Sequence, residues 1–431
     1  MYLPRSSRWS MTKRRKRPNL FGWTLFGLVV LFGYYFNQVY LPSQPNPFDA
    51  TPTVTRSPES LVTEAESFFK DGKLLQSIDA YQSAIDASPQ NAALYIAIAR
   101  VQVWAGKYAD AQANAENAIL LNNENSMAHA VRAWALDFQD KNSDAIDEIE
   151  KAIELDPNNA IAHAYRVEIL IDSGDFNNLQ TAIEVSKSAL GLDPNALETR
   201  RARGYLLEAT SNYEEAVQYY RSAIEVNPYI PILHKELGRN LRFLEVYDDA
   251  IKEFTLANTL NPSDPEPDLL ISRTYATIGD YTKALQYAES AMKDRPTDPR
   301  FHGNYGVMYY RNFRYQEAVD QLTLAIKGGK TDDGLPITGL ALTNDPRIAE
   351  YYYTYGLALA RTNQCGEALP IAQNLRTAFP SDDIVLEAAD AIDQICQENL
   401  DNPATATPQP ATATEEPTVA ATETPALTAT P

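Results

Sequence analysis

Apolar and polar positions along most of the chain follow the period of an amphipathic helix. In residues 197–209 and again in 213–226, apolar side chains recur three or four positions apart, and Ser211 and Asn212 separate the two segments. Pro228 follows the second segment and stops it. The pattern predicts a helical hairpin, in which two helices are joined by a short turn.

Alanines at a fixed interval indicate that this hairpin repeats along the chain. Successive members of the series lie 34 residues apart, except for one interval of 37. A hairpin of this length cannot bury its apolar face alone and must stack on its neighbours. Residues 58–399 are therefore predicted to form nine stacked hairpins with a capping helix at about 383–399. The alanines are Ala84, Ala118, Ala152, Ala189, Ala223, Ala257, Ala291 and Ala325.

Two further positions in each unit carry a consistent residue type. A small residue falls where the two helices cross in eight units, with Val167 as the exception, and seven units end at a proline. The small residues are Ala65, Ala99, Ala133, Gly204, Gly238, Ser272, Gly306 and Gly356, and the prolines are Pro89, Pro157, Pro194, Pro228, Pro262, Pro296 and Pro380. This pattern resembles the tetratricopeptide repeat family, which implies an all-α solenoid whose first helices line a concave face where partner segments dock.

Two insertions interrupt the period. Three extra residues near 176–180 lie at the turn between helices and leave the stacking intact. The segment 328–346 contains four glycines and Pro336, which exclude a continuous helix and leave a long loop or a short hairpin. Its part 335–342 is either a contact for a partner or a simple spacer.

The start of the chain has the composition of a membrane anchor. Residues 1–19 contain seven basic residues and no acid, and residues 20–41 are apolar and uncharged. A transmembrane helix over 20–41 is predicted, with a cytoplasmic head and everything after it extracytoplasmic. A cleaved signal peptide is the alternative. Residues 42–57 are rich in proline and are predicted to be an extended linker.

Charge and composition limit the partners. The chain carries a net charge of −20, and since seven of its 37 basic residues lie in the head, the remainder is more acidic still. Nucleic acid is therefore not an expected partner. Residues 400–431 are rich in threonine, alanine and proline and are predicted to be a disordered tail.

No motif indicates catalysis, a cofactor or a metal. Gly329-Lys330-Thr331 lacks the preceding glycine of a phosphate-binding loop, and no zinc or nucleophile signature occurs. The four histidines lie in different units, too far apart to share a metal ion. They are His129, His163, His234 and His302. We therefore predict that the protein is not an enzyme.

Two cysteines lie near the end of the array. Cys365 begins the second helix of the ninth unit, and Cys396 ends the antiparallel helix that follows. Both should lie at the same end of the stack, and an extracytoplasmic compartment is oxidising. A Cys365–Cys396 disulfide is predicted, with two unpaired buried thiols as the alternative.

The resemblance to the repeat family implies a partner-binding groove on the first helices. The residues that would line it are Arg201, Tyr205, Lys235, Arg239, Arg242, Phe243, Arg273, Tyr310 and Arg311. A basic strip of this kind suits an acidic peptide. Glu198, Glu208 and Glu236 lie on the same helices, however, and a solvated face of ion pairs is the alternative. Trp104 and Trp134 in earlier units either belong to the core or give the groove an apolar half.

These observations favour a membrane-anchored scaffold that mediates protein–protein interaction on the extracytoplasmic side of a cell envelope. Its expected partners are a protein or peptide that can carry an acidic segment, and a lipid bilayer through residues 20–41. A secreted or wall-associated protein that binds an anionic glycan or polymer is the alternative from another class.

Overall fold

The protein is described by a computed structural model, which covers residues 20–36, 38, 56–175 and 177–402. The chain divides into two units, residues 1–57 and 58–431. The predicted basic head, the tail after residue 402 and most of the linker lie outside the described residues, as do residues 37 and 39–41 of the predicted membrane span.

In the described part of the first unit, the helix α1 spans Leu20–Tyr35. Within the described ranges no helix combines the length and apolar character needed to cross a membrane. The transmembrane helix predicted over 20–41 is therefore not found.

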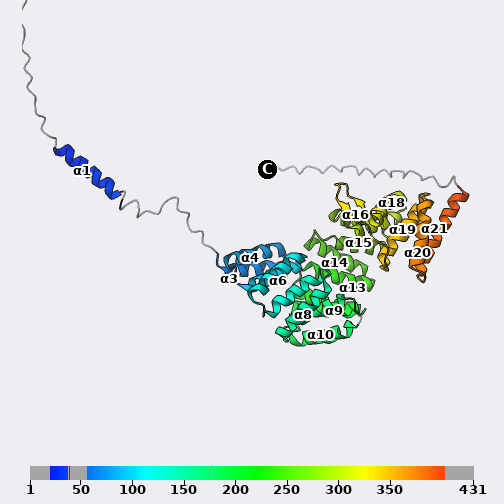
Figure 1. Ribbon diagram of the computed structural model, residues 1–431, viewed down its shortest axis with the longest axis horizontal. Coiled ribbons are helices and arrows are strands. Elements are labelled where there is room, and N and C mark those ends of the chain that lie inside the picture. Colours follow the sequence, from blue (N-terminus) through cyan, green and yellow to red (C-terminus); the bar gives the residue numbers. More distant parts are fainter. Residues whose placement is uncertain (1–19, 37, 39–55, 176, 403–431) are drawn as a thin grey trace, which may run out of the picture. The chain divides into compact units, whose positions relative to one another are not determined.

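The second unit is an array of helical hairpins, coloured from blue to orange-red along the chain in Figure 1. The residues described from 58 to 402 form nine helix pairs and one closing helix, as the sequence pattern predicts. The pairs are α3(Pro58–Lys70) with α4(Leu74–Ala87), α5(Ala92–Trp104) with α6(Tyr108–Leu121), α7(Ser126–Asp137) with α8(Asn142–Leu155), α9(Ala160–Asp172) with α10(Asn178–Leu192), α11(Leu197–Ala209) with α12(Tyr213–Val226), α13(Pro231–Phe243) with α14(Tyr247–Leu260), α15(Glu266–Thr277) with α16(Tyr281–Asp294), α17(Pro299–Arg311) with α18(Tyr315–Lys327), and α19(Pro346–Arg361) with α20(Cys365–Ala378), followed by α21(Asp383–Asp401). The all-α hairpin array is thus confirmed.

Local side chains define where several first helices begin. The side chain of Asn125 accepts a hydrogen bond from the backbone amide of Ala128, and Asn91 and Asn159 cap the helices one unit before and one unit after in the same way. Asp298 and Asp345 cap α17 and α19, each directly before a proline in the first turn. These residues satisfy backbone amides that have no partner inside the helix.

The insertion between α18 and α19 forms a short hairpin, one of the two structures predicted for it. Strand β1(Gly329–Lys330) pairs antiparallel with β2(Pro336–Ile337). The amide of Leu340 donates to the carbonyl of Ala325 at 2.9 Å, and the hydroxyl of Tyr352 donates to the carbonyl of Leu340 at 2.8 Å. The hairpin is therefore fixed to the helices on both sides of it.

A disulfide closes the end of the array. Cys365 and Cys396 are bonded, with their Cα atoms 5.6 Å apart, so the predicted pairing is confirmed. Ile392 and Ile395 of α21 are buried against the neighbouring helices. The bridge therefore holds α21 at the position where its apolar side covers the last repeat.

Small residues allow the helices of each pair to approach closely. Ala65, Ala99 and Ala133 are fully buried at the crossing positions. At Gly238 of α13, an added Cβ would lie 2.6 Å from the nearest ring atom of Phe254, which is itself fully buried in α14. The ring of Phe254 thus fills the space that a larger residue at position 238 would need.

The first repeat also contacts the turn between the fifth and sixth repeats, far along the chain. The side-chain amide of Asn227 donates to the carbonyl of Phe69 at 3.2 Å. Tyr229 lies directly over Gly72, where an added Cβ would be 2.2 Å from the Cβ of Tyr229. Arg100 of α5 forms an ion pair with Glu198 of α11. The first six repeats therefore close on themselves instead of leaving an open groove.

The close contact at Gly238 predicts opposite effects for two glycine substitutions. Gly238→Ala should lower the free energy of unfolding by about 1–3 kcal/mol, because the new methyl group overlaps a buried ring. At Gly191 of α10, an added Cβ has no atom within 4 Å. Gly191→Ala should therefore raise the free energy of unfolding by up to about 1 kcal/mol, because alanine has the higher helix propensity. Chemical denaturation of both variants measures the two effects. Equal effects at the two positions would contradict the packing described for α13 and α14.

Candidate functional site

The guanidinium group of Arg201 occupies the interior of the closed first six repeats. Its Nε donates to Glu236 at 3.1 Å, its Nη2 lies 2.6 Å from the same carboxylate, and its Nη1 pairs with Glu168. The indole nitrogen of Trp134 donates to Glu168 at 2.9 Å. Arg201 is only 2 % exposed. The structure thus places this predicted groove residue in a buried network.

Aromatic rings surround the same guanidinium. Its central carbon lies 5.7 Å from the ring centres of Trp104 and Phe138, 5.9 Å from that of Tyr205 and 6.0 Å from that of Trp134. Such contacts stabilise a desolvated cation by electrostatic attraction to the ring face. Trp104 and Trp134 are buried, so they belong to the core and do not line an apolar half of a groove.

Two further residues of the predicted strip are also paired with acids. Lys235 lies 3.0 Å from Asp264, and Arg239 lies 3.0 Å from Glu208. Together with the Arg201–Glu236 pair, these contacts neutralise the part of the strip that lies on α11 and at positions 235 and 239 of α13. The hydroxyl of Tyr205 donates to Asp172 and is likewise occupied.

The remaining arginines of the strip, together with Arg347, line a pocket in the sixth to ninth repeats. The pocket has a volume of about 210 Å³, and one arginine comes from each of the four first helices: Arg242 from α13, Arg273 from α15, Arg311 from α17 and Arg347 from α19. The other lining residues are Ala276, Thr277, Tyr281, Asn304, Met308 and Glu350. We call the cavity lined by these four arginines the arginine pocket.

The arginine pocket carries an excess of positive charge. Glu350, its one lining acid, lies 3.1 Å from Arg347. In the part of the chain that the structure describes, no salt bridge involves Arg242, Arg273 or Arg311, and Arg273 instead donates to the hydroxyl of Tyr351 at 3.2 Å. Burial lowers the pKa of Arg242, and the nearby positive charges of Arg347 and Arg273 lower it further. The pocket is thus arranged to receive an anion.

Two aromatic residues predicted for the groove lie outside the pocket lining. Phe243 is half exposed and stacks on Tyr213, with ring centres 4.6 Å apart. Tyr310 packs against Tyr315 at 5.4 Å. Arg347, in contrast, lines the pocket and is absent from the predicted set. Its signal in the sequence is the triplet Asp345-Pro346-Arg347, which repeats the Asp298-Pro299-Arg300 triplet of the preceding unit.

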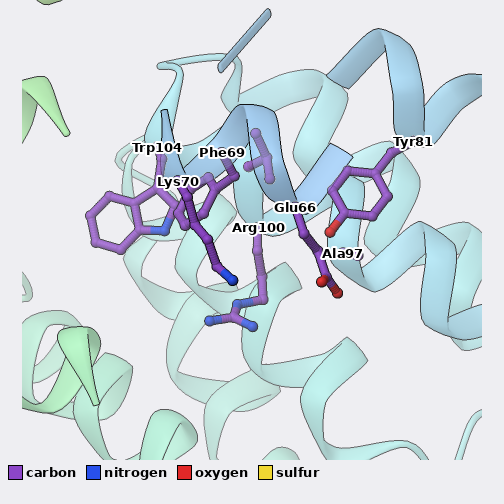
Figure 2. Close-up of a pocket in the computed structure, with 8 residues that line it drawn as sticks. Glu66, Phe69, Lys70, Tyr81, Ala97, Arg100 and Trp104 are labelled. Atoms are coloured by element: carbon purple, nitrogen blue, oxygen red, sulfur yellow. The ribbon is translucent and has the colours of Figure 1, made fainter. Parts of the chain in front are cut away.

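A second pocket, of about 140 Å³, lies in the first two repeats (Figure 2). In this view Trp104 and Tyr81 flank the pocket, and the side chains of Lys70 and Arg100 lie between them. Glu66 also lines the pocket, and Arg100 pairs with Glu198, so the charges here largely balance. This pocket therefore offers an apolar wall but no net charge for recognition.

Acidic side chains next to Arg201 have shifted protonation equilibria. Burial raises the pKa of Asp137 to about 9, and the neighbouring carboxylates of Asp172 and Glu168 raise it further. Burial also raises the pKa of Asp172. Burial and the adjacent carboxylates therefore favour the protonated form of Asp137 in the folded protein, because two adjacent buried carboxylates cannot both carry a charge without a large electrostatic cost.

Comparison with known protein families agrees with this architecture. Profiles described as tetratricopeptide repeat match residues 96–160 and 269–336, and a further tetratricopeptide repeat profile matches residues 202–229. The chain therefore contains tetratricopeptide repeats in these segments. No curated protein matches its sequence.

Solved structures share the fold at low sequence identity. The human IFIT1 dimer with PPP-AAAA is 15 % identical, with a TM-score of 0.52 over 80 % of this chain and 83 % of that one. A tetratricopeptide repeat protein from Parabacteroides merdae has 16 % identity and a TM-score of 0.39 over 58 % of this chain and 98 % of its own. Pseudomonas aeruginosa pilF has 16 % identity and a TM-score of 0.42, covering 56 % and 97 %. The first of these supports the fold alone.

The protonated state of Asp137 predicts a pH dependence of stability. An aspartate in the unfolded chain has a pKa of about 4, so the folded repeat protein binds more protons between about pH 4 and pH 9. The stabilising contribution of Asp137 is thus fully present at low pH and is lost as pH rises through this window. Relative to Asp137→Asn, wild type should lose up to about 1.4 kcal/mol per pH unit between pH 5 and pH 9.

Denaturant titrations at several pH values measure this difference. Asp332→Asn removes a negative charge from the exposed β1–β2 turn and serves as the matched control. A wild-type minus Asp137→Asn difference that does not change with pH would show that Asp137 is ionised in the folded protein.

Proposed function

We propose that this repeat protein is a scaffold that holds partner proteins at a cell envelope. Repeats of this family support protein–protein interaction, and nothing in the sequence indicates a reaction. Stacked hairpins present side chains from consecutive first helices as adjacent rows, which suits the recognition of an extended segment. The segment 335–342 of the insertion is a further candidate contact, since its hairpin adjoins α18 and α19.

The arginine pocket is the observation that carries this proposal. The first six repeats fill the space around Arg201 with its partners, and their pocket of about 140 Å³ has balanced charges. The sixth to ninth repeats instead carry a cavity of about 210 Å³ with three guanidinium groups that no described acid pairs with. We therefore assign partner binding to the first helices of the later repeats, and expect the partner to contain an acidic segment.

Three observations support an extracytoplasmic, membrane-anchored location. The helix α1 contains no charged residue, and Phe21, Leu31 and Phe32 are each more than 60 % exposed within its own unit, which is typical of a surface that another apolar phase covers. The seven basic residues before it favour a cytoplasmic start. The Cys365–Cys396 disulfide requires an oxidising compartment for the repeats.

A secreted or wall-associated protein for an anionic glycan is the second candidate. The chemistry of the arginine pocket is compatible with it, because guanidinium groups bind sulfate and carboxylate groups alike. The two candidates differ in what retains the chain: an anchor keeps it in membranes after a high-pH wash, whereas a secreted chain is released.

Crosslinking in washed membranes tests the proposed scaffold. Captured proteins are compared between wild type and the double charge reversal Arg242→Glu/Arg273→Glu. Loss of close charge contacts costs about 2–5 kcal/mol, so recovery of the partner should fall at least tenfold.

The matched control is Lys252→Glu/Lys293→Glu. These lysines lie on the second helices of the same two repeats and are 74 % and 66 % exposed, and their reversal makes the same change in net charge. Equal recovery from wild type and the arginine reversal, or an equal loss in both reversals, would contradict partner binding at the arginine pocket. Absence of the chain from washed membranes would favour the secreted alternative.

A further inference from the structure

The arginine pocket differs from the buried basic side chains of the first six repeats, which are paired with acids. Arg201, Arg239 and Lys235 each lie within ion-pair distance of a carboxylate, and Arg100 pairs with Glu198. The chain has 57 acidic and 37 basic residues, so counter-ions are plentiful. Three guanidinium groups that line one pocket without a carboxylate partner therefore point to a ligand that supplies the missing charge.

Glu350 gives the pocket a resident counter-ion at one edge. Its carboxylate lies 3.1 Å from Arg347, three residues earlier on α19, and the side chain is 20 % exposed while that of Arg347 is 47 % exposed. Exposed pairs of this spacing contribute only about 0.3–0.5 kcal/mol, so an incoming anion can replace Glu350 at small cost. The pocket can thus exchange an internal carboxylate for an external one.

We propose that the arginine pocket binds a pair of adjacent carboxylates on an acidic segment of a partner protein, and that Glu350 competes with this segment for Arg347. This inference rests on the proposed scaffold function, which supplies a protein segment as the ligand. One ligand carboxylate takes the position of Glu350 on Arg347, and the second neutralises the guanidinium groups of Arg242 and Arg273. Arg311 lies at the exposed rim and attracts the segment.

The lining of the pocket fits such a ligand. Met308 and Ala276 provide apolar surface for the methylene groups of glutamate side chains, while the planar guanidinium groups can each donate two parallel hydrogen bonds to a carboxylate. Burial lowers the pKa of Arg242, and the positive charges of Arg347 and Arg273 add to this effect because they repel its charged form. A bound pair of carboxylates relieves that repulsion.

A short acidic segment also fits the charge of the whole chain. The overall net charge of −20 repels long polyanions, and this repulsion extends over about 10 Å at moderate ionic strength. Two adjacent carboxylates place only a small charge inside the pocket and need not approach the acidic surface elsewhere. A local site for a protein segment is therefore favoured over a site for a long anionic polymer.

Binding of defined peptides to the full-length chain in detergent tests the proposal. The probe is a fluorescent peptide, Ala-Ala-Glu-Glu-Ala-Ala, and its comparison is the same peptide with two glutamines, both capped at each end. Fluorescence anisotropy should show binding of the first peptide that weakens with salt, and at least tenfold weaker binding of the second. Arg273→Gln and Arg242→Gln should each weaken the glutamate peptide at least tenfold, while Glu350→Gln should tighten it severalfold.

Two controls keep the result interpretable. Arg221→Gln removes an exposed arginine from the second helix α12 and should leave binding unchanged. Arg311→Gln changes an exposed side chain at the rim, so its reduced affinity separates loss of binding from loss of folding if a more buried variant unfolds. Thermal melting confirms that each variant is folded.

Several outcomes would overturn the proposal. Equal affinity for the glutamate and glutamine peptides, or binding that survives Arg273→Gln in a folded variant, would exclude the carboxylate pair as the ligand. Weaker binding by Glu350→Gln would show that Glu350 supports the site and does not compete for it. Binding of a sulfated oligosaccharide that depends on Arg273, without binding of the glutamate peptide, would identify a glycan site. Partner capture in membranes without peptide binding would leave the scaffold standing and reject this ligand alone.

Discussion

The buried guanidinium group of Arg201 is the interaction on which the closed arrangement of the first six repeats depends. It joins Glu168 of α9 to Glu236 of α13 and lies among the rings of Trp104 and Phe138 from earlier repeats. Removing one partner of a buried ion pair typically costs about 3–5 kcal/mol, because the other charge remains desolvated. The buried ion pairs of Arg201 therefore hold together helices that are distant in sequence.

The helical hairpins could be predicted from sequence because each depends only on nearby residues. Small residues such as Gly238 recur at the crossing positions, and the pairing of Cys365 with Cys396 follows from two antiparallel neighbours. The contact of Asn227 with Phe69 could not be predicted, since it depends on small rotations that accumulate over five repeats. The apolar segment 20–41 predicted a longer helix than α1, which ends at Tyr35 among the described residues.

The candidate site could be predicted only in part, because it too depends on contacts between distant repeats. Spacing places Arg201 and Arg273 in adjacent rows on one face of the first helices, but it cannot tell which of them is buried and which lines an open pocket. Arg201 is buried between acids, whereas Arg273 lines a cavity with no acid paired to it. Arg347 escaped prediction because the preceding insertion interrupts the period. One repeat pattern thus produces a self-filled interior in the early repeats and a charged cavity in the later ones.

The measurement that tests this division most directly is residue-resolved chemical modification of arginines in the folded, full-length protein, with a dicarbonyl reagent and detection by mass spectrometry. The account predicts that Arg311 and Arg347 react rapidly, that Arg242 and Arg273 react more slowly but measurably, and that Arg201 stays unmodified until the protein unfolds. Modification of Arg201 at the rate of Arg311 would show that the first six repeats are open, and would contradict the assignment of partner binding to the later repeats.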